Sequence, residues 1–416
     1  MTEASPIGIL SELFGSAIEA ANPIFAVPPH LPPPPRGRTL VLAAGKAAAA
    51  MAYAVEANWP GELSGIAVTR YGHGVRCQKI EVIEAGHPLP DDAGRGAARR
   101  FLEEARALGP DDLLLFLVSG GASALLVEPA PGLSLEEKQE ITKALLASGA
   151  PIGEMNCLRK HLSAIKGGRL AALAAPARVV TLAISDVPGD DPAVIGSGPT
   201  VGDPRTCADA LAIAARRGIA LSEAARNALA VGAWESVKPG DPLLANATYE
   251  IIAKPSDSLA AAAARARDDF ALEAVVLGHD IEGEACEVAL QHAALAKRSG
   301  PGVILSGGET TVTVTGNPGH GGRNCEYLLA LAIALDGAPG IHAIACDTDG
   351  IDGTEDAAGA VIGPDTLERA RAAGLDPAAM LAAHESYTFF DTIDDLIMTG
   401  PTRTNVNDFR AILIEP

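Results

Sequence analysis

Two positively charged side chains stand where a helix is expected to begin. Lys46 follows the apolar run TLVLAAG and opens the segment AAAAMAYAV, and Arg323 follows the glycine-rich GHGG and opens NCEYLLALAIAL. A helix is partially positive at its N-terminus, so a cation there is disfavoured unless an anion lies nearby. We therefore predict that both residues help to bind anions. The simpler alternatives are that Lys46 reaches into water and that the glycine-rich loop before Arg323 only precedes a core helix.

Aspartates gather in two loops that follow expected strands. They are Asp186, Asp190 and Asp191 in ISDVPGDDPAVIGSGPT (184–200) and Asp347, Asp349 and Asp352 in ACDTDGIDGTED (345–356). Mg²⁺ prefers one or two carboxylates together with water and substrate phosphates, so either loop could hold it. A calcium loop of the EF-hand type is excluded for the second, because the twelfth position counted from Asp347 is Ala358 rather than a glutamate. Aspartate is also common in turns and helix caps, which leaves a structural role open for each.

The motif Ser-Gly-Gly follows an apolar strand twice, in LVSGGAS (117–123) and ILSGGET (304–310). Glycine lets the backbone approach a ligand, and successive backbone N–H groups can cradle phosphate or carboxylate oxygens. We predict two similarly built anion-binding loops, although tight turns after strands also favour glycine and serine. The candidate binding residues are Ser119, Gly120, Gly121, Ser123, Ser197, Ser306, Gly307, Gly308, Glu309 and Asn324.

The segment MNCLRKHLSAIKGGRLAAL (155–173) is the densest basic stretch and is expected to form one helical segment. Its basic residues do not share one helical face, so part of the stretch is expected to be solvated. Lys160 or Lys166 is a candidate for binding an acidic substrate. Near the C-terminus, the polar residues of TNVNDF (404–409) form either a structural turn or ligand contacts.

Short β-branched and leucine-rich runs alternate with alanine-rich helical segments along most of the chain. This alternation predicts an α/β fold with parallel sheets that are covered on both faces. Ligands of such folds bind beyond the carboxyl ends of the strands. A change of composition near VKPGDPLLANA (237–247) predicts a boundary between domains of residues 1–240 and 241–416.

The composition is that of a globular protein of 416 residues, 48% of them hydrophobic and 20% charged. The formal net charge of −20 repels phosphate backbones and anionic lipids, which argues against nucleic-acid and membrane partners. Six cysteines without a C-x-x-C pair favour reduced thiols over a zinc site or disulfide framework. The acidic N-terminus and the lack of an apolar run of roughly 18 residues predict no signal peptide and a cytoplasmic protein.

Two nucleotide-binding fingerprints are missing from the chain, G-x-x-x-x-G-K-[ST] and G-x-G-x-x-G after a strand. A nucleoside triphosphate would therefore not be held by a Walker-type loop, and a dinucleotide-dependent oxidoreductase is disfavoured.

Taken together, the motifs resemble those of the class II glycerate kinases, a two-domain family whose C-terminal part is known as the MOFRL domain. The matching stretches are AAGKAAAAMA, LVSGGASALL, NCLRKHLSAIKGGRLA, SDVPGDDPAVIGSGPT, LSGGETTVTVTGNPGHGGRN, DTDGIDGTEDAAGA and TNVNDF. They follow the family's order over most of the chain; residues 205–300 are less distinctive. The resemblance implies a Rossmann-like parallel or mixed sheet in the N-terminal domain and a second α/β domain.

The resemblance also implies an activity, the ATP-dependent phosphorylation of D-glycerate to 2-phosphoglycerate in a cleft between the domains, with a divalent metal such as Mg²⁺. Lys46 and Arg323, essential in the family, would stabilise charge on the transferred phosphoryl group. The Ser-Gly-Gly loops would hold the glycerate carboxylate and the nucleotide phosphates, and Asp349 would accept the hydroxyl proton. The candidate metal ligands are Asp186, Asp190 and Asp347. The expected assembly is a monomer or homodimer.

Two other functions stay open. Family members have been named hydroxypyruvate reductases of tartrate breakdown, an activity that would oxidise NAD(P)H, and the missing dinucleotide fingerprint argues against it. A non-catalytic sensor of sugar acids or nucleotides would keep the glycine loops. It would have no need of Lys46, Arg323 and paired aspartates.

Overall fold

The computed structural model describes residues 5–314 and 319–416, so residues 1–4 and residues 315–318 of the glycine-rich stretch lie outside the described part. Contacts divide the chain into two compact units. The central unit comprises Pro23–Ile252, and the terminal unit combines Met1–Asn22 with Ala253–Pro416.

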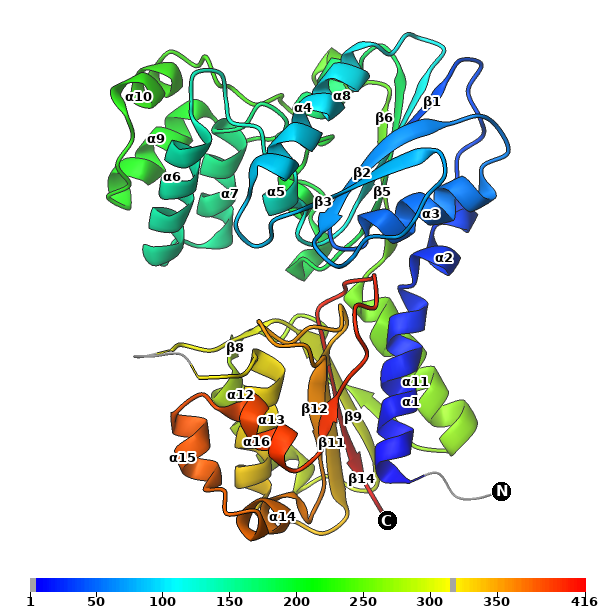
Figure 1. The fold of residues 1–416 in the computed structure, drawn as a ribbon, viewed down its shortest axis with the longest axis vertical. Coiled ribbons are helices and arrows are strands. Elements are labelled where there is room, and N and C mark those ends of the chain that lie inside the picture. The colour runs from blue at the N-terminus through cyan, green and yellow to red at the C-terminus, as the bar shows by residue number, and fades with distance from the viewer. Residues whose placement is uncertain (1–4, 315–318) are drawn as a thin grey trace. The chain divides into compact units, whose positions relative to one another are not determined.

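The central unit contains a six-stranded sheet in the order β3-β2-β1-β4-β5-β6 (Figure 1). Its strands are β1 (Thr39–Ala44), β2 (Ser64–Arg70), β3 (Ile80–Ala85), β4 (Leu113–Val118), β5 (Arg178–Ile184) and β6 (Ala247–Ala253). The strands from β3 to β5 along this order pair in parallel, as the sequence predicted. After β1 the chain adds β2 and β3 on one side of β1, and it then adds β4 on the other side. Loops after β1 and β4 therefore flank the position where ligands of such sheets bind.

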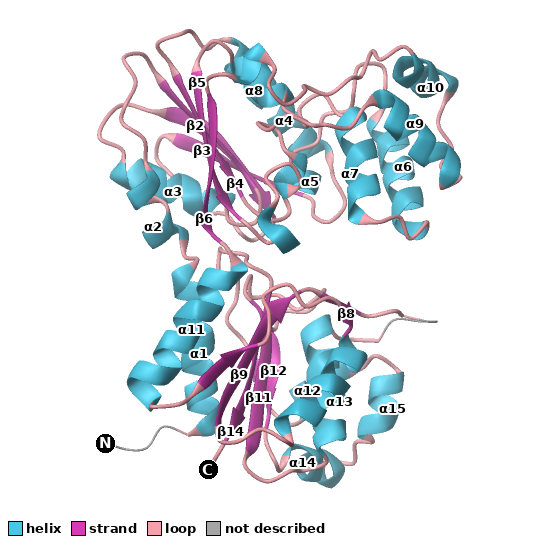
Figure 2. Cartoon of the chain, turned by 180° about the vertical axis from the view of Figure 1, so that it is seen from behind, coloured by secondary structure: helices cyan, strands magenta, loops and turns pink. Residues whose placement is uncertain are grey.

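Helices cover both faces of this sheet. Figure 1 shows α3 on one face and α4 with α8 on the other. The helices of the unit are α2 (Pro23–Ala26), α3 (Ala48–Asn58), α4 (Asp92–Arg106), α5 (Ala122–Leu125), α6 (Leu135–Ala147), α7 (Ile152–His161), α8 (Arg169–Ala174), α9 (Cys207–Arg216) and α10 (Glu223–Ala230). Figure 2 shows α6, α7, α9 and α10 grouped beside the sheet, where they share a second apolar core.

The terminal unit contains a mixed sheet in the order β13-β12-β11-β14-β9-β7. Its strands are β7 (Ala274–Val276), β9 (Gly302–Gly308), β11 (Ile341–Asp347), β12 (Gly359–Ile362), β13 (Leu396–Ile397) and β14 (Asp408–Ile414). Only β7 and β9 pair in parallel among the described strands of this sheet; β14 is antiparallel to both β11 and β9. The expectation of a parallel sheet is wrong here, because β11 and β12 are joined by a loop without a crossover helix. A strand buried on both faces has the same apolar pattern in either orientation.

Two pairs of helices cover this second sheet, α1 with α11 on one face and α12 with α13 on the other (Figures 1 and 2). The helices of the unit are α1 (Pro6–Ala20), α11 (Pro255–Phe270), α12 (Ala285–Ala296), α13 (Arg323–Leu335), α14 (Thr366–Ala372), α15 (Pro377–Ala382) and α16 (Ser386–Thr392). Alternate residues of β9 pack on opposite faces of the sheet. Val303 and Leu305 pack in the core with α1, and Ile304 packs in the core with α13. The predicted N-terminal domain of residues 1–240 included α1, whereas the structure places α1 in the terminal unit, where its apolar side is buried. Among the described residues, every helix is too short or too polar to span a bilayer.

Candidate active site

Lys46 lies in the turn between β1 and α3, and hydrogen bonds connect this turn to the loop that follows β4. Its backbone N–H donates to the carbonyl of Gly120 at 2.8 Å, and the N–H of Ala47 donates to Ser119 Oγ at 3.0 Å. A Cβ at Gly45 would lie 2.6 Å from the carbonyl oxygen of Ser119, so only glycine allows this approach. The two loops predicted to bind anions therefore form one connected surface of the central unit.

The first Ser-Gly-Gly turn continues this surface. Gly121 adopts a φ of +80° and precedes α5, and a Cβ there would lie 3.1 Å from His87 Nε2 and 3.2 Å from Lys46 Cγ. Ser123, in α5, forms a 2.6 Å hydrogen bond with the buried hydroxyl of Ser197. The structure thus brings together Lys46, the first Ser-Gly-Gly turn and Ser197.

Asp186 and Asp190 follow β5 in the same unit. Both side chains are partly buried, and Asp190 has a left-handed φ of 53°. Its Oδ1 is buried and accepts no hydrogen bond from the described residues. A buried oxygen without a donor fits a hard cation, which prefers oxygen ligands. The residues present are therefore compatible with Mg²⁺ at this loop.

Arg323 lies at the first position of α13 and bonds three carboxylates that the sheet aligns. Asp408 is the register partner of Asp347 on one side and of Gly308 on the other. The guanidinium donates to Asp408 at 2.8 Å and to Asp347 and Glu309 at 2.9 Å each. Burial lowers the pKa of Arg323, but the three carboxylates outweigh it and hold the pKa well above its ordinary value. The predicted anion partners of this cation are thus side chains of the protein itself.

Asp408 joins the elements of this cluster, and it is almost fully buried. Its Oδ1 accepts from Arg323 and from Asn324 Nδ2 at 2.9 Å, and its Oδ2 accepts from Arg410 at 2.6 Å. Arg410 is itself buried and lies over the Tyr327 ring. Sequence reasoning left Asp408 undecided between turn and ligand contact and missed Arg410, because an arginine inside an apolar strand has no local signal of its partner.

The N-terminus of α13 is capped by a side chain of the chain itself. Asp352 accepts hydrogen bonds from the backbone N–H groups of Asn324 at 3.0 Å and Cys325 at 2.9 Å. Desolvation raises the pKa of Asp352, in spite of these donors. A Cβ at Gly322 would lie 2.3 Å from Asp352 Cγ, which explains a glycine next to the cap. These helix N–H groups are therefore already occupied by an anion.

Asp347 is the last residue of β11 and Asp349 follows it, and both are buried. The N–H of Asp349 donates to Asp347 Oδ1 at 3.0 Å, and the N–H of Ile351 donates to Asp349 Oδ1 at 2.9 Å. The candidate ligand Asp347 belongs to the terminal unit, whereas Asp186 and Asp190 belong to the central unit. The candidate metal ligands thus come from both units.

The second Ser-Gly-Gly motif differs from the first, so the prediction of two similarly built loops is wrong. Ser306, Gly307 and Gly308 are the last residues of the buried strand β9. A Cβ at Gly308 would lie 2.3 Å from the backbone of Ile281, and Gly307 exchanges backbone hydrogen bonds with Gly278 and Ile281. Close packing of the backbone accounts for these glycines. A binding role for them stays a prediction.

A cavity of about 360 Å³ lies beside Arg323 in the terminal unit. Its described lining includes Gly319, Gly321, Gly322, Arg323, Thr310 and His384. The glycine-rich stretch thus borders an open space next to a cation, as expected of an anion-binding loop.

The basic stretch of residues 155–173 is not one helix, and only Arg159 and Arg169 among its basic residues are partly exposed. Gly167 and Gly168, both with positive φ, separate α7 from α8. Lys160 and Lys166 are buried. Lys160 pairs with Asp203 at 3.3 Å, whereas Lys166 donates to the carbonyls of Ser123 and Gly196. Only the second of these two candidates reaches the Ser-Gly-Gly turn.

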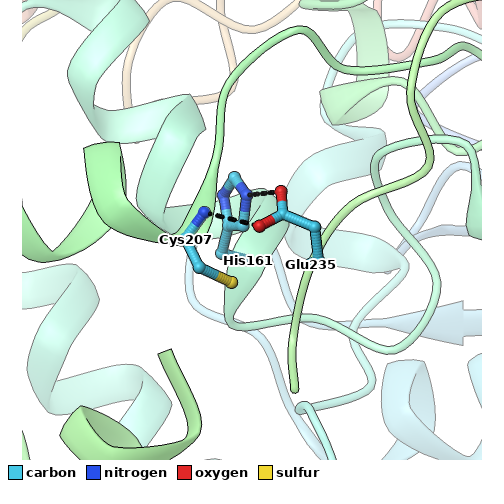
Figure 3. Close-up of side chains that lie close together, drawn as sticks. All are labelled: His161, Cys207 and Glu235. Atoms are coloured by element: carbon cyan, nitrogen blue, oxygen red, sulfur yellow. Dashed lines mark hydrogen bonds and ion pairs between the residues drawn. The ribbon is translucent and has the colours of Figure 1, made fainter. Parts of the chain in front are cut away.

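His161, Cys207 and Glu235 form a compact group whose possible ligand atoms lie within 4.8 Å of one another (Figure 3). Their contacts are satisfied within the protein: His161 Nδ1 bonds the Cys157 carbonyl, and the Cys207 N–H donates to Glu235. Burial raises the pKa of the Cys207 thiol to about 11, which favours the neutral thiol in the metal-free protein. We interpret the group as a structural link between α7, α9 and the segment before β6.

Comparisons with known proteins agree with this architecture. A model described as a domain of unknown function (DUF4147) matches residues 9–230, and the MOFRL family model matches residues 302–408. A D-glycerate 2-kinase of Thermotoga maritima is 39% identical, with 97% of each chain covered. An Agrobacterium vitis protein, provisionally named a hydroxypyruvate reductase, is 54% identical, with 98% of this chain and 94% of that protein covered. The crystal structure of a Thermotoga maritima glycerate kinase superimposes with a TM-score of 0.88 at 38% identity and 98% coverage of both chains.

A Rossmann-like unit with a Ser-Gly-Gly turn beside Lys46 and a second α/β unit with an arginine–carboxylate cluster define a two-unit α/β protein whose relatives include kinases. The chain belongs to the glycerate 2-kinase family that ends in a MOFRL domain.

Proposed function

We propose that the protein is a glycerate 2-kinase, which transfers the γ-phosphoryl group of ATP to the 2-hydroxyl of D-glycerate and forms 2-phosphoglycerate and ADP. The observation that supports this most strongly is the full-length similarity to a D-glycerate 2-kinase, together with the placement of the motif residues at strand ends and helix starts.

The reaction needs positioning and charge stabilisation more than covalent chemistry by the protein. The 2-hydroxyl oxygen attacks the γ-phosphorus; that O–P bond forms while the bond to the β–γ bridging oxygen breaks, and ADP leaves. The hydroxyl proton passes to a carboxylate, for which we propose Asp349. Its Oδ1 accepts a hydrogen bond from the Ile351 N–H, which helps to hold the carboxylate in place.

Lys46 and Arg323 are the proposed cations for the transferred group. All three nitrogens of the Arg323 guanidinium already bond carboxylates. Glu309 is half exposed, whereas Asp347 and Asp408 are buried. Exchanging Glu309 for a phosphate oxygen therefore costs least, and we propose that Arg323 Nη1 is the atom that the phosphoryl group meets.

The proposed ligands of Mg²⁺ are two carboxylates after β5, Asp186 and Asp190, and the one that ends β11, Asp347. When bound, the ion would neutralise charge on the phosphate oxygens of ATP. The residues keep the ligand oxygens in place through burial and through backbone donors such as the Asp349 N–H. Chelation of divalent ions is expected to abolish turnover.

The rival activity, reduction of hydroxypyruvate, has support from the name of the Agrobacterium relatives. The chain has no dinucleotide-binding fingerprint, which argues against this activity. Two assays on one preparation separate the activities: ADP release with ATP, Mg²⁺ and D-glycerate, and NADH or NADPH oxidation with hydroxypyruvate. We expect the first only; cofactor oxidation without ADP release would overturn the proposal. Binding of D-glycerate without either reaction would favour a sensor.

A further inference from the structure

A cavity of about 190 Å³ in the central unit is lined by basic side chains that converge from four segments. These are His87 after β3, Lys138 on α6, Arg159 on α7 and Lys166 before α8. The wall is completed by Gly121 and Ser123 of the Ser-Gly-Gly turn. Segments far apart in the sequence therefore contribute basic side chains to one small space near Lys46.

Three of these four side chains, Lys138, Arg159 and Lys166, have no acidic partner among the described residues. Lys138 Nζ donates to the Leu162 carbonyl at 2.5 Å, and Lys166 Nζ donates to the Ser123 carbonyl at 3.0 Å. Within the described part of the chain, no carboxylate forms an ion pair with Lys138, Lys166 or Arg159. Glu128, the acidic group that faces Lys138, is instead bound by two arginines of α4. Both lysines are more than nine-tenths buried, so leaving them without an anion is costly.

The neighbouring Lys160 provides an internal contrast. It is as buried as Lys138 and comes from the same basic stretch as Lys166, but it pairs with Asp203 at 3.3 Å. Burial lowers the pKa of Lys138 to about 7, with Arg169 and Arg159 adding to the effect. Burial, Lys138 and Arg159 likewise lower the pKa of Lys166. A negative charge in the cavity would remove this penalty by favouring the protonated amines.

We propose that this cavity binds the carboxylate of the sugar-acid substrate, with Lys138, Arg159 and Lys166 as the residues that determine specificity for an acid. The volume suits one end of a small hydroxy acid, and it is too small for a nucleotide. The neighbouring Ser123 hydroxyl and Lys46 place this end of the substrate next to the first Ser-Gly-Gly turn. The proposal rests on the kinase function for the identity of the acid.

The test compares Lys138→Met, Lys166→Met and Arg159→Met with Lys143→Met, an exposed lysine of the same helix as Lys138. Each change removes one positive charge. Arg159 forms no side-chain hydrogen bond within the described residues, so its removal leaves no protein acceptor unpaired. KM for D-glycerate is measured at saturating ATP, and KM for ATP at saturating D-glycerate.

We expect the KM for D-glycerate to rise about 10- to 100-fold in the three cavity variants, the range for a lost hydrogen bond to a charged group. The KM for ATP should stay within about twofold, and Lys143→Met should match the wild type. Selectivity for D-glycerate over glycerol, which lacks the carboxylate, should fall by the same factor. A rise in the KM for ATP alone would mean that the cavity holds a nucleotide phosphate. Unchanged KM values in Arg159→Met and in either lysine variant would overturn the assignment.

Calorimetric titration of D-glycerate without ATP separates this inference from the proposed function. If the wild type binds D-glycerate and the cavity variants do not, the cavity assignment stands even when no ADP is formed. If the wild type forms ADP but the cavity variants bind D-glycerate normally, the assignment fails and the kinase function stands.

Discussion

Lys138→Met is expected to stabilise the central unit at low pH while it weakens substrate binding. The pKa of Lys138 falls from 10.5 to about 7 on burial. Each tenfold change in an acid dissociation constant corresponds to about 1.4 kcal/mol, so the buried amine costs about 5 kcal/mol below pH 7. Methionine removes this cost but leaves the Leu162 carbonyl without its donor, a loss of about 1–3 kcal/mol. The net expectation at pH 6 is a gain of about 2–4 kcal/mol.

This gain must shrink as the pH rises. Between pH 7 and about 10.4 the unfolded chain binds more protons at Lys138 than the folded chain, so the stability of the wild type rises through that window. The variant lacks this rise, and its advantage should disappear near pH 9. The charged groups that act on Lys138 are Glu128, Arg159, Arg169 and Lys166.

Urea unfolding followed by tryptophan fluorescence suits this measurement. The two tryptophans, Trp59 and Trp234, both lie in the central unit, so the signal reports that unit. Lys143→Met is the control for loss of charge alone. A variant that is less stable than the wild type at pH 6, or a difference that stays constant from pH 6 to 9, would refute a depressed pKa at Lys138.

The other predictions concern the two helix starts and the cap. Lys46→Ala should lower kcat by about 10²–10³, by analogy with the loss of a donor that stabilises developing charge, and steady-state kinetics with near-normal turnover would contradict its role. Arg323→Ala should lower kcat similarly and destabilise the terminal unit by about 2–4 kcal/mol, because Asp347 and Asp408 lose a buried partner; calorimetric unfolding measures this. Asp352 has a raised folded pKa, so it binds more protons in the folded state, and wild-type stability should fall as the pH rises from about 3.9 toward that value. Asp352→Asn should lack this fall in acid-unfolding curves.

Much of the fold and part of the site could be predicted from local sequence. The apolar strands of the central unit are buried on both faces, which the runs TLVLAA and LLLFLV already indicate. The polar residues after β1 and β4 meet because parallel strands end at the same edge. The antiparallel orientation of β14 could not be predicted, since the apolar pattern of a buried strand is the same in either direction.

The partners of the charged groups could not be predicted from the sequence, for a different reason. Arg323 finds Asp408 across 85 positions and Lys166 finds Ser123 across 43. No periodicity encodes such distances. Glycines pose a related ambiguity, because Gly308 is required by the Ile281 backbone and Gly121 by a positive φ beside Lys46, yet each is the second glycine of a Ser-Gly-Gly motif.

The central claim is that phosphate moves from ATP to the secondary hydroxyl of D-glycerate. Phosphorus NMR of a reaction with ATP, Mg²⁺ and D-glycerate tests it directly, because the 2- and 3-phosphate esters give distinct proton-coupled signals. The structure and its relatives predict a doublet from 2-phosphoglycerate that grows with ADP. A triplet from 3-phosphoglycerate, or no new phosphate ester, would contradict the account.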